Sequence, residues 1–93
     1  HAQGTRIKYI YHLNEALKIS DVLAKNWSGS SWNDYYNYEY TYDNQMNLIS
    51  IFVTAWDRFG EKWVDYERYT YTYDENGNRL TDLGEGWTGS YWF

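Results

Sequence analysis

The chain has 93 residues and a formal net charge of −5, and it contains neither cysteine nor proline. This length suits one domain with a modest core, which disulfides cannot stabilise. The negative charge opposes nucleic-acid binding, because that needs clustered Lys and Arg. No run of about 18 apolar residues predicts a membrane span, and the first residues do not resemble a signal peptide.

Seven segments read as β-strands, because Tyr, Thr, Trp and aliphatic residues recur there between turn residues. In chain order they are 6–11, 17–27, 31–42, 48–56, 62–73, 79–87 and a stub at 91–93. Helix is an alternative only over 14–26, where some apolar residues partly fit helical spacing. The pattern predicts an all-β antiparallel meander of about seven strands, as a single curled sheet or a rolled sandwich.

A hairpin signal lies at 69–81, where alternating Tyr and Thr precede Asn76-Gly77. A weaker copy lies at 38–50, with Met46 in place of the glycine, so a different turn geometry is expected there. The residues expected to build these turns are Asp43, Asn47, Asp74, Asn76, Gly77 and Asn78.

The two copies are 31 residues apart, and several identical residue types recur at this spacing. The same offset leads back from Tyr40 and Tyr42 to Tyr9 and Tyr11. We therefore expect one repeat domain over 1–93, composed of a degenerate repeat at 6–27, repeats at 27–56 and 56–87, and a terminal stub at 87–93.

In 31–42, side-chain alternation places Trp32 on the same face of the sheet as Tyr36 and the tyrosines that follow it. In 62–73, it places Trp63 on the same face as Tyr69. In 48–56 the odd positions form an aliphatic stripe, while Phe52 and Trp56 point the other way. Apolar side chains on both faces predict a sheet that curls, packs against something or leaves rings in water.

Pairs of tryptophans flank short polar segments with glycine three times along the chain. Exposed rings beside Asp, Asn and Glu suit stacking against sugars, so we predict a glycan-binding or cell-surface recognition module. The candidate ligand-binding residues are Trp27, Trp32, Trp56, Trp63, Trp87, Trp92, Tyr36 and Tyr66. The alternative is a purely structural β-repeat segment of a larger surface protein, in which these rings close hairpin ends.

No enzymatic activity, metal or cofactor is expected. Carboxylates such as Asp34, Asp57 and Asp65 are not distinguishable from a solvated strand face, although a glycosidase would need a facing pair. Residues 74–78 lack the further ligands of a calcium loop, and His1 and His12 lack the partners of a zinc site. Unpaired strands at 6–11 and 91–93 predict edge-to-edge self-association.

Residues 71–81, Tyr-Thr-Tyr-Asp-Glu-Asn-Gly-Asn-Arg-Leu-Thr, resemble the Tyr-Asp repeat (YD or Rhs-type) of bacterial surface and toxin proteins and of teneurins. The tryptophan-flanked segments look like the variant in secreted Bacteroidetes proteins. This resemblance implies β-hairpin repeats without chemistry of their own and an extracellular or cell-surface location in a bacterium. A looser similarity is to choline-binding repeats, whose spacing is shorter.

Overall fold

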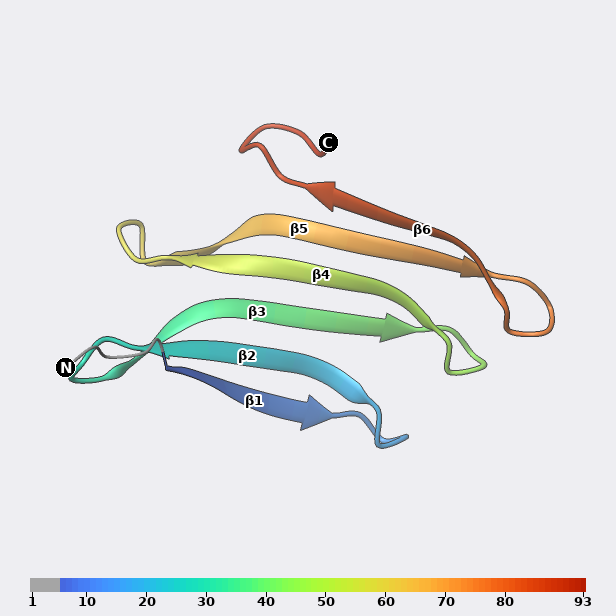
Figure 1. The fold of residues 1–93 in the computed structure, drawn as a ribbon, viewed down its shortest axis with the longest axis horizontal. Helices are drawn as coiled ribbons and strands as arrows, with labels where there is room; N and C mark the ends of the chain where they lie inside the picture. The colour runs from blue at the N-terminus through green and yellow to red at the C-terminus, as the bar shows by residue number, and fades with distance from the viewer. Residues whose placement is uncertain (1–5) are drawn as a thin grey trace.

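The computed structural model describes residues 6–93, and these form one open antiparallel sheet (Figure 1). Its strands meander in chain order, each pairing with the next. They are β1 (Ile7–Leu13), β2 (Ile19–Trp27), β3 (Trp32–Tyr42), β4 (Leu48–Asp57), β5 (Lys62–Tyr73) and β6 (Arg79–Gly86). The all-β antiparallel prediction is confirmed, as a single sheet that does not close.

One detail of the predicted meander is wrong. The described residues form six strands and not about seven, because the stub at 91–93 makes only an isolated bridge between Trp87 and Trp92. The strand predicted over 17–27 is confirmed as β2, and its helical alternative over 14–26 is excluded, because β2 pairs with strands on both sides and the described residues contain no helix. Pairing on both sides outweighs the weak helical spacing of this segment.

Three turns with one geometry gather at one end of the sheet (Figure 1). In each, an Asn or Asp side-chain oxygen accepts two backbone N–H groups of the turn: Asn14 from Ala16 and Lys18, Asp43 from Gln45 and Asn47, and Asp74 from Asn76 and Asn78. The hydrogen bonds from Asn47 and Asn78 hold the pKa values of Asp43 and Asp74 below their usual range. Local side-chain chemistry therefore specifies all three turns.

The fourth residue of each turn has a left-handed backbone, with φ of 62° at Leu17, 65° at Met46 and 82° at Gly77. Hairpin loops of this kind combine a type I turn with a left-handed residue. A separate one-residue bulge follows in each returning strand, at Ser20, Ile49 and Leu80. The different geometry expected at Met46 is therefore wrong. Asp43 and Asn47 impose the turn, and Met46 bears its strain.

Two further bulges, at Tyr35 and Tyr66, separate the tryptophans from the tyrosines. The register moves from Ala24–Tyr36 to Lys25–Asp34 across the first of them, and the second lies at the matching place in β5. Each extra residue reverses the side-chain alternation. Trp32 therefore lies on the face opposite Tyr36, which corrects the prediction that they share one.

The core lies on one face of this single sheet. Tyrosines on β1, β3 and β5 flank small aliphatic residues on β2 and β4, and Val22, Ala24 and Val53 are only 1–3% exposed. We call this surface the tyrosine face. It comprises Tyr9, Tyr11, Val22, Ala24, Tyr36, Tyr38, Tyr40, Ile51, Val53, Ala55, Tyr69 and Tyr71.

Two tyrosine hydroxyls connect successive hairpins. Tyr42 of β3 donates to the carbonyl oxygen of Ile19 in β2 at 2.8 Å, and Tyr73 of β5 donates to that of Leu48 in β4 at 2.6 Å. Both bonds are partly buried and satisfy a carbonyl at the start of the preceding returning strand. They hold the turn ends of neighbouring hairpins together.

Replacing Leu17 with glycine is expected to stabilise the protein by about 0.5–1 kcal/mol, because glycine adopts positive φ without strain. Leu17 is 78% exposed and loses little packing. Urea denaturation measures the change. Ala16→Gly in the same turn is the matched control, and it should lower the free energy of unfolding. Equal effects of the two substitutions would contradict the strain at Leu17.

Stability is expected to fall as pH rises above about 10, the ordinary pKa of tyrosine. Burial raises the pKa values of Tyr36, Tyr38, Tyr40 and Tyr69. These phenols keep their protons in the fold but lose them in the unfolded chain, so their contribution is complete below pH 10 and declines above it. Urea denaturation at stepped pH, followed by phenolate absorbance, measures this.

Tyr38→Phe keeps the ring but removes one proton site whose pKa burial raises, so it should flatten this pH dependence. Ionisation of all tyrosines near pH 10 with the sheet intact would show that the tyrosine face is not a buried core.

Candidate functional site

The tryptophan-bracketed turns gather at the end of the sheet opposite the Asp and Asn turns (Figure 1). Each turn closes on a cross-strand pair of tilted or edge-on rings, with centroids 5.3 Å apart in Trp27–Trp32, 5.2 Å in Trp56–Trp63 and 5.1 Å in Trp87–Trp92. This geometry is favourable for aromatic pairs. The pairs lie on the face opposite the tyrosines, which we call the tryptophan face.

The outer two pairs have additional contacts. The Lys8 Nζ atom lies 4.6 Å from the centroid of a Trp32 ring, and the Arg68 guanidinium lies 4.1 Å from that of Trp92. Arg68 also donates to both carboxylate oxygens of Glu85, and Phe52 packs near Trp92. Cation–π contacts and packing hold these rings in place. The Trp56–Trp63 pair has no comparable cation among the described residues.

A groove of about 800 Å³ lies between the tip of the β2–β3 hairpin and that of the β4–β5 hairpin. It exists because the β3–β4 pairing stops at Tyr36–Ala55, so the two tips diverge beyond that row. Its lining combines aromatic, amide, hydroxyl and charged side chains. They are Asn26, Ser28, Asn33, Asp34, Tyr35, Trp56, Asp57, Arg58 and Phe59.

The polar groups of the groove are partly held by neighbours. Asp34 pairs with Lys25 at 3.1 Å, and the Asp57 carboxylate accepts the backbone N–H of Phe59 at 3.0 Å. Phe59 itself is 92% exposed at the tip of its turn. An almost fully exposed phenylalanine contributes little to the core, so its ring is free to contact a ligand.

An aromatic cluster continues from the groove onto the tyrosine face. Tyr35, which lines the groove, lies 4.3 Å from Tyr36 between ring centroids, and Tyr36 lies 5.1 Å from Tyr66. Burial, together with the hydroxyls of Tyr66 and Tyr35, raises the pKa of Tyr36. The two bulges thus bring Tyr35 and Tyr66 to the same aromatic cluster.

Only Trp56 among the predicted binding residues lines the groove. Tyr36 and Tyr66 lie in the adjoining cluster, whereas the remaining tryptophans form the pairs of the tryptophan face, with Trp27, Trp32 and Trp63 just over one-third exposed. The sequence interpretation missed Tyr35, Arg58 and Phe59. The available signal for the last two was the middle turn, which is two residues longer than the others.

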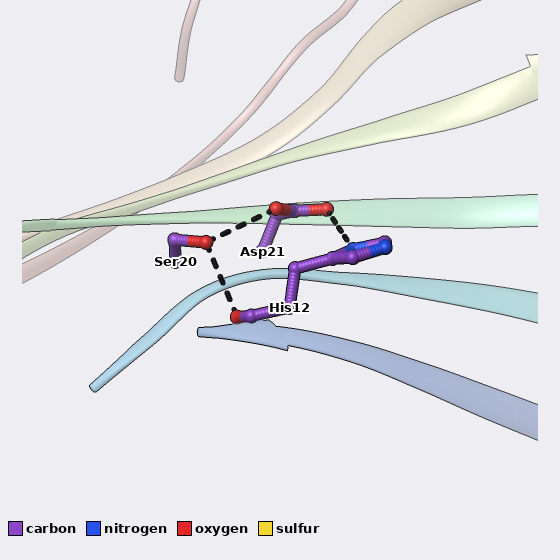
Figure 2. A network of polar contacts seen from close by, with 3 residues as sticks. All are labelled: His12, Ser20 and Asp21. Atoms are coloured by element: carbon purple, nitrogen blue, oxygen red, sulfur yellow. Dashed lines mark hydrogen bonds and ion pairs between the residues drawn. The ribbon is translucent and has the colours of Figure 1, made fainter. Parts of the chain in front are cut away.

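A Ser–His–Asp group lies at the turn end of β1 and β2 (Figure 2). The His12 Nδ1 atom is 2.9 Å from Asp21, but the Ser20 hydroxyl lies against the Asp21 carboxylate and the His12 carbonyl oxygen. The Ser20 hydroxyl makes no hydrogen bond to a ring nitrogen of His12, whereas a nucleophilic triad requires the imidazole to accept the serine proton. The group reads as a local network that ties the bulged strand to its neighbour.

Within residues 6–93, no group of three or more His, Asp or Glu side chains is placed to hold a metal ion. No helix in that part of the chain is long and apolar enough to cross a membrane. His1 lies outside the described residues.

Two crystal structures share this fold. A DUF3836 family protein from Parabacteroides distasonis is similar with a TM-score of 0.76 and 22% identity, over 92% of this chain and 78% of that one. Another DUF3836 family protein, from Bacteroides vulgatus, is similar with a TM-score of 0.73 and 13% identity, over 92% of this chain and 87% of that one. A search of curated proteins finds no match.

The resemblance to YD or Rhs-type repeats is wrong as a family assignment. The family model that matches is DUF3836, described as a family of unknown function, over residues 2–87, and both structural neighbours belong to it. The Tyr-Asp motif misled because it encodes a turn: Asp74 accepts two N–H groups and Gly77 takes positive φ. Any hairpin of this type favours those residues. The chain belongs to the DUF3836 family.

Proposed function

We propose that the protein recognises glycans, without catalysis, through the groove between the β2–β3 and β4–β5 tips. The observation that supports this most is the lining of that groove, where Tyr35, Trp56 and Phe59 accompany Asn, Asp, Ser and Arg side chains. Aromatic rings suit the C–H faces of sugars, and the polar groups suit sugar hydroxyls.

The shape of the groove also supports a ligand that is long and flexible. It is open, lies between two projecting hairpin tips, and continues through Tyr35 to the Tyr36–Tyr66 cluster. A series of rings along one path offers successive stacking positions. A surface of this kind suits a chain of several sugar units, as expected of an extracellular or cell-surface module.

Repetition of a two-stranded unit accounts for two residues of the groove lining, Arg58 and Phe59. The last paired residues before the three Asn and Asp turns are Leu13, Tyr42 and Tyr73, which are 29 and 31 positions apart. The difference of two equals the extra length of the Trp56–Trp63 turn. We infer a 29-residue unit whose middle copy has gained two residues in that turn, which carries Arg58 and Phe59.

Removing the Phe59 ring is expected to weaken glycan binding by about 2- to 12-fold, the loss of one aromatic contact of roughly 0.5–1.5 kcal/mol. A glycan array identifies a bound sugar, and titration of tryptophan fluorescence with the corresponding soluble oligosaccharide gives the affinity. Phe59→Ala is the test variant, since its exposed side chain makes folding effects small.

Tyr91→Ala is the matched control, because Tyr91 is also an exposed aromatic at the tryptophan end, in a different turn and 64% exposed. Its affinity should equal that of the unmodified protein. Equal losses in both variants would remove the groove as the site. Absence of binding to every glycan would favour the alternative of a structural segment.

A further inference from the structure

We propose that β1 of one molecule pairs in antiparallel fashion with β6 of a second copy, so that the sheet continues from molecule to molecule. This proposal is independent of glycan binding. Within residues 6–93, the outer edge of β1 and most of that of β6 have no strand beside them. An interface of this kind joins two different surfaces and therefore does not close into a dimer.

The sheet already makes the corresponding interface twice. β6 is equivalent in position to β2 and β4, since each follows an Asn or Asp turn and leads to the first tryptophan of a pair. β1 is likewise equivalent to β3 and β5, which precede such turns. The β2–β3 and β4–β5 contacts thus show how the free edges of two molecules fit together.

The equivalence predicts a register. Val22 faces Tyr38, and Ile51 faces Tyr69, so Asp82 is expected to face Tyr9 of the second copy. Leu23 faces Asn37, and Phe52 faces Arg68, so Leu83 is expected to face Lys8 of that copy. The joining strands would bury Tyr9 and Leu83, which are 51% and 54% exposed.

The free backbone groups agree with this register. The Trp27 N–H donates to the Arg6 carbonyl, and hydrogen-bonded pairs alternate, so Tyr9 turns its peptide groups outward from β1. On β6, Gly86 exchanges two hydrogen bonds with Phe93 on the outer side, so Asp82, four residues earlier, also faces outward. Because Phe93 already occupies the outer side of Gly86, fewer residues of β6 are open to pairing with β1 of the second copy. The association between molecules is therefore expected to be weaker than the strand pairings within one molecule.

The charges of the two edges are complementary. Residues 6–13 carry Arg6 and Lys8 and no carboxylate, whereas β6 carries Asp82 and Glu85. The one cation of β6, Arg79, stacks over Tyr71, 4.2 Å from the ring centroid. In the predicted register Lys8 lies diagonally across from Glu85, which Arg68 already contacts, and opposite charges at that spacing favour pairing. A pairing of two β1 strands would instead bring like charges together.

A cysteine trap tests this register directly, because the chain has no cysteine of its own. Lys8→Cys and Leu83→Cys proteins are mixed in equal amounts in a thiol–disulfide buffer, and the cross-linked species are separated by mass. The expected result is an 8–83 disulfide clearly above the statistical proportion, in which random pairing already makes the mixed dimer twice as abundant as either homodimer. The control replaces Leu83→Cys with Asp82→Cys, whose side chain points to the opposite face, and should give only a statistical mixture.

Sedimentation of the unmodified protein over rising concentration provides a second readout that needs no substitution. The average mass should grow beyond that of a dimer and should fall on addition of salt, which screens the edge charges. A mass that stays monomeric at every concentration would overturn the proposal. So would a growth limited to dimers, which indicates a closed twofold interface, or a preference for 8–8 cross-links, which indicates twofold pairing of β1.

Discussion

The structure depends on tyrosine rings that cover small aliphatic side chains on one face of an otherwise open sheet. A sheet normally buries an apolar face against a second layer, which the described residues do not provide. Here the neighbouring strands supply the cover, so that Val22, Ala24 and Val53 are almost inaccessible. A Cβ atom at Gly84 would lie 3.1 Å from the Tyr69 ring, so the same cover extends over β6. The high tyrosine content follows from this need.

The bulges at Tyr35 and Tyr66 connect this core to the candidate site. They reverse the side-chain alternation, so tyrosines face one side of the sheet and tryptophan pairs face the other. Beyond them the hairpins are no longer paired with each other, and their tips separate to form the groove. The tryptophan pairs stabilise the projecting tips. The two bulges therefore separate the tyrosines from the tryptophan pairs and also mark where the groove proposed for recognition begins.

The sequence predicts the strands well because Tyr–Thr alternation and the Asp and Asn turns are local signals. Strand ends are mostly within one or two residues, and the antiparallel order follows from the short turns. The faces were mispredicted from Trp32 and Trp63 because a bulge has no reliable single-sequence signal. The groove was missed because it arises where pairing stops between β3 and β4, which depends on non-local register. The resemblance to YD or Rhs-type repeats is misleading because the Tyr-Asp motif encodes a common hairpin turn and does not by itself indicate a shared family.

The most direct test of the recognition groove is a nuclear magnetic resonance titration of the indole N–H signals with an oligosaccharide that the protein binds. Trp56 reports on the groove, whereas the Trp27–Trp32 and Trp87–Trp92 pairs report on the rest of the tryptophan face. The account predicts that the Trp56 signal shifts most, because it alone among the six tryptophans lines the groove. Shifts concentrated at Trp27 or Trp87, with Trp56 unchanged, would contradict it.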